Sequence, residues 1–324
     1  MLPTVIFNFR NYWKHPLVNK YINGDKHEGI LILEKGKKPI WISHPFYFAQ
    51  AKKETKGMKI ILMKKNSLKK ILSRKKKIGY DERHTTVAQM KLLKKIFKGK
   101  KLVDVSSEIE KEREIKTKEE LEKIGKASKE TKKVIGKIRK ILNKGVSEKK
   151  VEKLFEKEFE KNGFSMAFCI VAFGSNTKEL HHIPGKRKLK EGEEVLIDVG
   201  AKYKGYCADI SESFWFGKKQ SKKRSDYEKE LRFVKDKLEI VKNCMKPGIK
   251  AKKLWKLCED MKMPHALGHG LGLEEHDYPP GIGSKSEWKL KEGMILAIEP
   301  GLYKRFGIRV EKDFLITKKG CREL

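Results

Sequence analysis

Short apolar runs rich in β-branched residues alternate with helical segments along the first hundred positions. The runs predict strands at Thr4–Phe9, Gly29–Glu34, Pro39–Ile42, Lys59–Met63, Lys77–Asp81 and Lys101–Val105. Helices are predicted between them at His44–Lys56, where Pro45 suits a first turn, and at Ser67–Ser73 and Thr86–Phe97. This alternation predicts an α/β domain over residues 1–106, and we identify no catalytic constellation within it.

The rest of the chain repeats a pattern of two helices followed by strands. After Ser107–Lys116, a linker or a short helix, Thr117 and Glu120 form a capping-box signature for a helix that reaches about Asn143. Its apolar face comprises Leu121, Ile124, Ala127, Val134 and Ile138, and further helices are predicted at Ser147–Asn162, Ser225–Cys244 and Ile249–Met261. Strands follow each helix pair, so we expect residues 107–324 to form one domain of two similar halves around a shared site.

The charge of the chain is strongly positive. There are 77 basic and 43 acidic residues, a net charge of +34, and lysine greatly outnumbers arginine. Such a charge attracts nucleic acid and other polyanions without specificity. The densest basic runs, Lys64–Lys77, Lys91–Lys101, Lys123–Lys144 and Lys218–Arg224, lack the interleaved aromatic residues of a platform for single strands. Two interpretations stay open, a solvated lysine-rich surface and a functional footprint for a polyanion.

Cysteine usage and hydropathy indicate the compartment. The five cysteines are far apart and form no CxxC pair, which is typical of free thiols in a reducing cytosol. The N-terminal stretch lacks the features of a signal peptide, and no apolar run approaches the ~18 residues of a membrane span. We therefore expect a cytoplasmic protein with no membrane association.

Four acidic residues and one histidine stand out in the last 130 positions. Asp198, Asp209, Glu299 and Glu311 each lie in an apolar, β-branched setting where a solvated acid is out of place. A buried carboxylate has to be paired, hydrogen-bonded or bound to a metal. With His269, these four acids suggest a site for two divalent ions. The two acid pairs are 11 and 12 residues apart, which is within the reach of a hairpin.

Simpler interpretations of these residues are weighed against the metal site. Asp198 could cap a turn while Asp209 faces solvent, and Glu299 or Glu311 could form a structural ion pair with Arg309. His265 and His269 have the i, i+4 spacing of a helical zinc pair, but the glycines around them argue against a helix and instead allow close backbone approach. Three histidines within twelve positions of a glycine-rich stretch are unusual for core residues.

The motifs resemble those of a known family. IDVGAKYKGYCADIS, HALGHGLGLEEHDYP, AIEPGLY and GIRVE match, in order and spacing, the metallopeptidases of the prolidase and aminopeptidase P group, which share the pita-bread fold with methionine aminopeptidase and creatinase. REIKTKEELEKIGKAS is similar to the start of that group's catalytic domain, and IGYDER to the end of its N-terminal domain. The resemblance implies an α+β protein with a pita-bread catalytic domain of pseudo-twofold halves after a smaller, creatinase-like α/β domain.

The same resemblance implies site roles. Asp198 would bind one metal, Asp209 and Glu311 would bridge both, and His269 and Glu299 would complete the second. Manganese is the first expectation for two divalent ions per subunit, with cobalt, zinc or iron as alternatives. A hydroxide between the metals would hydrolyse the N-terminal Xaa-Pro bond of dipeptides or short peptides, with Glu299 as proton shuttle and His276 stabilising the intermediate. His181 and His265 would contact the substrate, as would Arg309 and Tyr303.

Some features depart from that group or leave alternatives. SESF at 211–214 replaces a frequent Thr-Arg-Thr type sequence, and Ser211 is expected to hydrogen-bond a ligand carboxylate. Ala266 replaces a frequent glycine, and the N-terminal domain is short and lysine-rich. A homodimer is expected from the resemblance. The alternative functions are a weakly catalytic pita-bread protein that binds nucleic acid or ribosomes, and a methionine aminopeptidase.

Overall fold

A computed structural model of the chain describes residues 1–9, 14–23 and 26–324. The chain divides into two compact units, Met1–Glu112 and Arg113–Leu324, which are described separately below. The division falls within the helix α5 (Ser106–Glu114), which occupies the stretch expected to be a linker or a short helix.

The N-terminal unit is built on one mixed six-stranded sheet. Its strand order is β4-β3-β2-β1-β5-β6, antiparallel among β1, β2 and β3 and parallel at the other pairings. The strands are β1 (Thr4–Asn8), β2 (Gly29–Leu33), β3 (Ile40–Ser43), β4 (Lys59–Leu62), β5 (Lys77–Tyr80) and β6 (Lys101–Asp104). Each strand predicted from the sequence is confirmed to within one residue, because alternating apolar residues mark their limits well.

Short helices accompany this sheet. They are α1 (Val18–Tyr21), the 3₁₀ turn η1 (Pro45–Tyr47), α2 (Phe48–Glu54), α3 (Ser67–Ile71) and α4 (Val87–Ile96). The helix predicted at His44–Lys56 was wrong in its first turn, which is 3₁₀, and α1 was not predicted. Leu68 and Leu72 at α3, with Leu93 and Phe97 at α4, pack on one face of the sheet, so these two helices end near each other.

The C-terminal unit contains two helix pairs, as its sequence pattern predicts. The first pair is α6 (Lys118–Ile141) and α7 (Glu148–Lys161), and the second is α8 (Lys222–Cys244) and α9 (Ala251–Lys256). The predicted capping box is present, since Thr117 and Glu120 exchange hydrogen bonds with each other's backbone N–H. The single helix predicted at Ile249–Met261 was wrong. The chain bends after α9 into the 3₁₀ turn η3 (Glu259–Met261), and Leu254, Cys258 and Met261 all reach the core.

Each helix pair covers strands of its own half. The first sheet has the order β10-β8-β7, with β7 (Ser165–Phe173), β8 (Glu193–Tyr203) and β10 (Ile210–Phe216), and β9 (Tyr206–Cys207) pairs with β8. The second has the order β11-β12-β15-β16, with β11 (Gly268–Gly270), β12 (Ile295–Ile298), β15 (Lys312–Ile316) and β16 (Cys321–Glu323). A separate hairpin joins β13 (Gly301–Tyr303) to β14 (Gly307–Arg309), and the 3₁₀ turn η2 (Gly174–Lys178) follows β7.

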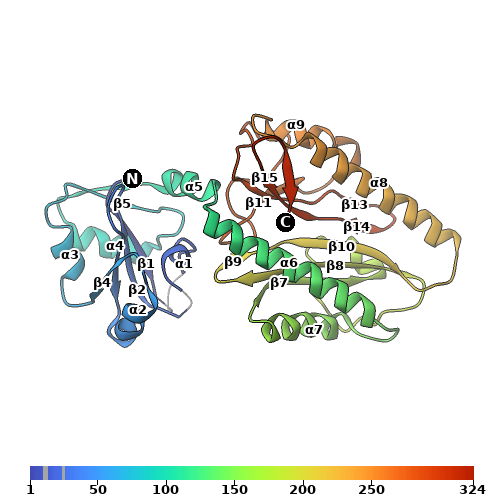
Figure 1. Ribbon diagram of the computed structural model, residues 1–324, viewed down its shortest axis with the longest axis horizontal. Coiled ribbons are helices and arrows are strands. Elements are labelled where there is room, and N and C mark those ends of the chain that lie inside the picture. The colour runs from blue at the N-terminus through green and yellow to red at the C-terminus, as the bar shows by residue number, and fades with distance from the viewer. Residues whose placement is uncertain (10–13, 24–25) are drawn as a thin grey trace. The chain divides into compact units, whose positions relative to one another are not determined.

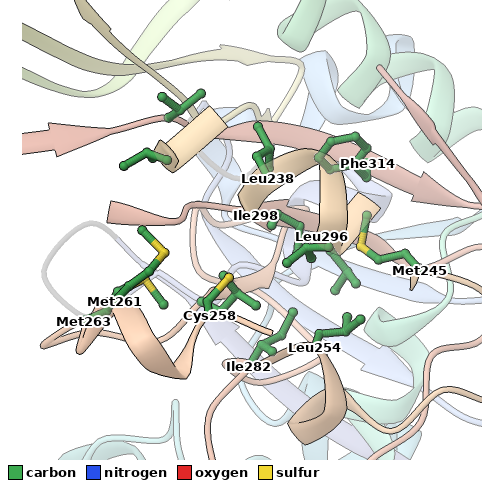
Figure 2. Close-up of a cluster of buried hydrophobic side chains, with 14 of the residues drawn as sticks. Leu238, Met245, Leu254, Cys258, Met261, Met263, Ile282, Leu296, Ile298 and Phe314 are labelled. Carbon is green, nitrogen blue, oxygen red and sulfur yellow. The ribbon is translucent and has the colours of Figure 1, made fainter. Parts of the chain in front are cut away.

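Two apolar cores hold these layers together. In the first half, Ile135 of α6 and Phe155 of α7 pack with Val171 and Ile197 of the sheet. In the second half, the side chains of α8 and α9 meet those of β12 and β15 in a fully buried cluster, drawn in Figure 2. Figure 1 shows the green α6 and α7 on the first half and the orange α8 and α9 on the second, so the strands that carry the candidate ligands lie between the helix pairs.

Candidate metal centre

The four candidate carboxylates come from two hairpins. Asp198 lies within β8, and Asp209 lies between β9 and β10, where the ladder continues through Ile210↔Val199. The turn that joins β8 to β9 is at Lys204–Gly205, with both residues at positive φ. Asp198 and Asp209 therefore occupy diagonal positions on one face of the hairpin.

The second acid pair brackets the β13–β14 hairpin. Glu299 follows β12 directly and Glu311 follows β14, and the pairing Gly301↔Arg309 extends by a hydrogen bond from Val310 N–H to the Pro300 carbonyl at 3.3 Å. Glu299 and Glu311 therefore stand opposite each other at the base of the hairpin. The 12-residue spacing seen in the sequence is the length of this excursion.

His269 reaches the same place from β11. This short strand pairs with β12 at His269↔Ala297, so the stretch is not helical, as its glycines predict. A Cβ atom on Gly270 would lie 2.4 Å from the carbonyl carbon of Tyr278, so only glycine allows the two segments to pack this closely.

The orientation of the His269 ring points to a cation. Its Nδ1 lies 3.1 Å from the Gly270 carbonyl and donates to it, which leaves the lone pair on Nε2. That nitrogen faces Asp209 Oδ2 at 3.6 Å, Glu299 Oε1 at 3.7 Å and Glu311 Oε1 at 3.8 Å. A lone pair facing three carboxylate oxygens is repulsive unless a positive ion lies among them, and the distances suit ligands around one ion.

The burial and the pKa values of these groups also indicate a bound cation. The buried oxygens Asp198 Oδ1 and Glu311 Oε1 have no hydrogen-bond partner among the described residues. Burial and the neighbouring carboxylates raise the pKa of Asp209 and of Glu311 well above their usual values, and burial raises the pKa of Glu299 to about 8. Burial lowers the pKa of His269 to about 3, so the ring is neutral and can act as a ligand. The residues present therefore fit a site for divalent metal.

Hydrogen bonds between distant strands orient the carboxylates. Ser211 Oγ donates to Glu311 Oε2 at 2.8 Å, as expected from the SESF stretch. Arg309 Nη2 donates to Asp198 Oδ2, and Arg309 Nε donates to Ser211 Oγ at 3.1 Å. The simple Arg309–Glu311 ion pair is therefore wrong, because the buried guanidinium is directed at Asp198. Burial opposes its charge, but the Asp198 carboxylate raises the pKa of Arg309 well above its usual value.

A cavity of about 910 Å³ opens over these groups. All five candidate ligands line it together with His181, His265 and His276, and Phe168, Ile170, Leu180 and Ile183 add apolar walls. His276 is exposed and stacks on His269 with ring centroids 4.0 Å apart, and His181 is exposed as well. The cavity thus presents two accessible imidazoles beside the carboxylate cluster.

His265 and Tyr303 are more constrained than these two histidines. His265 Nδ1 lies 2.7 Å from the Ala266 carbonyl, and Nε2 lies 3.1 Å from the Tyr303 hydroxyl. The same hydroxyl accepts a hydrogen bond from Arg309 Nη1 at 2.9 Å. Burial lowers the pKa of His265 to about 4 and raises that of Tyr303 to about 12, so both are neutral at pH 7.

Two supporting clusters were not predicted from the sequence. Arg113 Nε pairs with Asp277 Oδ1 at 2.9 Å, and the buried Lys116 Nζ donates to the Tyr278 carbonyl at 2.6 Å. These contacts hold the segment that follows His276. Both basic residues lie in the REIKTKEELEKIGKAS motif. The sequence therefore marked these two residues, but it did not indicate that they contact Asp277 and Tyr278.

The loop that carries His181 is held in a similar way. The fully buried Glu148 accepts hydrogen bonds from His182 Nε2 at 2.9 Å, from Phe173 N–H at 2.9 Å and from Gly185 N–H at 3.1 Å. Burial opposes protonation of His182, but Glu179 and Glu148 raise its pKa. His182 is therefore a structural residue, unlike its exposed neighbour His181.

The N-terminal unit also contains a group of residues that could ligate metal, at His15, Asp81 and His84. Asp81 Oδ2 lies 2.9 Å from His15 Nε2 and 3.0 Å from His84 Nδ1. Leu17 N–H donates to His15 Nδ1 at 3.2 Å, which places the proton of this ring on Nε2. Because a protonated nitrogen cannot bind a metal, these three residues form a hydrogen-bonded cluster that joins separate loops of the unit.

Comparisons with known proteins agree with this architecture. Residues 122–318 match Metallopeptidase family M24, and residues 16–115 match the Creatinase/Prolidase N-terminal domain. The chain belongs to metallopeptidase family M24, with a creatinase-type N-terminal domain before a pita-bread catalytic domain. An uncharacterized peptidase of Staphylococcus epidermidis is 32% identical, over 98% of this chain and 91% of that protein.

Solved structures resemble the whole chain. The X-Pro aminopeptidase from Thermotoga maritima has a TM-score of 0.89 at 26% identity and covers 100% of this chain and 95% of its own. The prolidase from Pyrococcus horikoshii has a TM-score of 0.86 at 26% identity, and the match covers 100% of this chain and 93% of the prolidase chain. Within the described residues, no helix has the length and apolar character needed to cross a membrane.

Proposed function

We propose that this peptidase hydrolyses the N-terminal Xaa-Pro bond of dipeptides or short peptides at a centre of two divalent metal ions. The orientation of His269 carries the proposal, because its unprotonated nitrogen faces three carboxylate oxygens at 3.6–3.8 Å. The proline preference is supported by similarity to an X-Pro aminopeptidase and to prolidases.

The grouping of the five residues supports the following ligand roles. Asp198 would hold one ion, His269 and Glu299 the other, and Asp209 and Glu311 would bridge them. Two divalent ions balance the charge of four carboxylates and, when bound, supply Lewis-acid activation of water at neutral pH. Manganese, cobalt, iron and zinc are all compatible with four oxygen ligands and one imidazole.

The protein's own groups would then manage the protons. Glu299 is less buried than the other three carboxylates, with 16% of its side chain exposed, so it can exchange protons with a bound substrate. It takes a proton from the attacking water and delivers it to the leaving amine as the C–N bond breaks. His276 would hydrogen-bond the carbonyl oxygen on which negative charge develops.

The cavity walls suit a short peptide with a proline ring. Its volume, about 910 Å³, lies within the usual range for small-ligand pockets. The apolar residues at its mouth include Ile183, which is 82% exposed and available for contact. His181 and His265 line the same cavity as this apolar wall and the carboxylates, and we expect them to contact the substrate near its scissile bond.

A substrate panel tests the proposal. Protein loaded with manganese or cobalt is offered an Xaa-Pro dipeptide, an Xaa-Pro-Xaa tripeptide, the same peptides with alanine in place of proline, and a Met-Ala peptide. We expect cleavage of the proline peptides only, and loss of nearly all activity in Asp209→Asn and Glu311→Gln. Metal-loaded protein that cleaves none of them would refute the proposal, and a preference for Met-Ala would favour methionine aminopeptidase chemistry.

A further inference from the structure

The net charge per residue is higher in the N-terminal unit than in the rest of the chain. Residues Met1–Glu112 contain 27 basic and 10 acidic residues, and the longer remainder contains 50 and 33. Both parts therefore have a net charge of +17, although the first is about half the length of the second. A uniform preference for lysine does not produce this asymmetry.

Acidic residues are missing from two stretches of this unit. Residues 55–80 contain ten basic and no acidic residues, and residues 84–103 contain six and none. The helices of the C-terminal unit differ, because residues 117–161 mix 15 basic with 9 acidic residues. Glutamate offsets more than half of the basic charge on those helices, whereas no acidic residue offsets the lysines of α3, α4 and β5.

The fold brings the two stretches together at one end of the sheet. β5 and β6 are parallel neighbours that both begin there, with Lys77 paired to Lys101. The Lys100 ammonium donates to the carbonyls of Leu72 and Lys75, each at 2.8 Å, so the turn after α3 lies against the turn after α4. Basic residues from two separate parts of the chain therefore share one surface.

Five cationic side chains of this surface are free for a ligand. They are exposed and, within the part of the chain that the structure describes, no carboxylate oxygen lies within 4.0 Å of their charged nitrogens: Arg74, Lys76, Lys77, Lys98 and Lys101. By contrast, the Lys75 ammonium is paired with Glu34 at 2.6 Å, and the Lys100 ammonium donates hydrogen bonds to backbone carbonyls. We call the five free residues the basic edge.

The peptidase reaction does not use this charge. Eight acidic residues line the cavity of the C-terminal unit, Arg309 is the only basic residue there apart from the histidines, and none of the lysines in the described part of the chain lines it. Attraction of peptides into that cavity therefore does not account for the basic edge.

We propose that the basic edge binds the phosphate backbone of duplex nucleic acid, without sequence preference. Basic residues without carboxylate partners, gathered where β5 and β6 begin and in the turns before them, suit the closely spaced phosphates of a duplex. Phe97, the aromatic residue next to Lys98 in the chain, is only 2% exposed, so its ring is not available for the base stacking used to bind single strands.

The test compares two variants with equal charge loss. One neutralises the basic edge with Arg74→Gln, Lys76→Gln, Lys77→Gln, Lys98→Gln and Lys101→Gln. The matched control neutralises five exposed lysines of the C-terminal unit with Lys218→Gln, Lys219→Gln, Lys222→Gln, Lys318→Gln and Lys319→Gln. A third variant replaces the four lysines of the edge by arginine and keeps the charge.

Binding of the full-length chain to a labelled DNA duplex of about 20 base pairs is measured by fluorescence anisotropy with a chelator present. For five phosphate contacts, affinity should fall about 500-fold between about 50 and about 200 mM salt. The edge variant should lose at least about 100-fold in affinity at the lower salt and most of the salt dependence, whereas the control and arginine variants stay near wild type.

Three results would overturn the proposal. One is equal weakening in the edge and control variants, which would show that total charge governs binding. Another is absence of binding by the wild type at about 50 mM salt. The third is binding to phosphatidylserine vesicles that is stronger than binding to the duplex. If the edge variant loses this vesicle binding, the surface would be assigned to membranes. Circular dichroism and melting temperatures of all variants verify that the substitutions leave the fold intact.

Discussion

Removing the charge of one candidate ligand should stabilise the metal-free protein. The perturbation is Glu299→Gln, which keeps the shape of the side chain and removes its ionisation. Burial raises the pKa of Glu299 to about 8 in the folded chain, from an ordinary value of 4.5. A group with a raised folded-state pKa binds its proton more tightly in the folded state than in the unfolded state.

The magnitude and sign follow from linkage. Below pH 4.5 the carboxyl is protonated in both states and has no effect on stability. As pH rises from 4.5 to about 8, the unfolded chain releases the proton while the folded chain keeps it, so stability falls by about 1.4 kcal/mol per pH unit. At pH 7 the accumulated cost is about 3 kcal/mol, and the neutral amide that the substitution introduces does not incur it.

The assay is urea unfolding of chelator-treated protein at several pH values between 5 and 8. Hydrogen exchange read by mass spectrometry on peptides of the C-terminal unit separates its unfolding from that of the N-terminal unit. We expect the variant to exceed the wild type by about 1 kcal/mol at pH 5 and by about 3 kcal/mol at pH 7. Manganese at about 1,000 times its Kd should reverse this order at pH 7, since a ligand at that concentration stabilises the wild type by about 4.1 kcal/mol.

The matched control is Glu292→Gln, which changes an exposed glutamate of the same unit and should leave the pH dependence unchanged. Parallel pH profiles for the wild type and Glu299→Gln, or a variant that is less stable without metal, would refute the electrostatic account of the site. A metal response that stays intact in the variant would argue against Glu299 as a ligand.

Three further predictions concern the same site. Ser211→Ala removes the hydrogen bond that orients Glu311, so metal affinity should fall about 10–100-fold in a metal titration, while Ser211→Thr should retain it. Lys116→Met removes the buried ammonium that donates to the Tyr278 carbonyl and should cost about 2 kcal/mol, seen as faster hydrogen exchange at 271–280; unchanged exchange would count against this role. Metal binding at pH 7 should release at least about one proton, because Glu299 has a pKa of about 8 in the metal-free protein. Calorimetry in two buffers of different ionisation enthalpy measures the number of protons released. Identical heats of binding in the two buffers would contradict the prediction.

Local features of the fold were predictable from the sequence. The six strands of the N-terminal unit lie within one residue of their predicted limits, and the caps at Thr117 and Ser147 are present. Alternation, capping residues and turn glycines act over a few positions, so the sequence records them directly. The bend after α9 was not predicted, because it depends on how Leu254, Cys258 and Met261 pack into the core of the second half.

The candidate site was only partly predictable. Acids in apolar surroundings and a histidine among glycines single out the five candidate ligands, and the structure brings all five to one cavity. Their roles as ligands, the choice of metal and the expected homodimer stay predictions. The sequence could not show which of the two adjacent histidines is exposed in the cavity, as His181 is, and which is held in a structural hydrogen bond, as His182 is.

The sequence by itself determined the local elements, the catalytic family and the residue types that a metal centre needs. Tertiary structure decided how those residues are paired, such as Arg309 with Asp198 and Ser211 with Glu311. These partners are about 100 residues apart in the chain, and only the packing of the hairpins against the sheet makes them neighbours. The basic edge has the same origin, since two acid-free stretches become one surface because β5 and β6 lie side by side. Such contacts depend on strand order and register, which long-range packing sets.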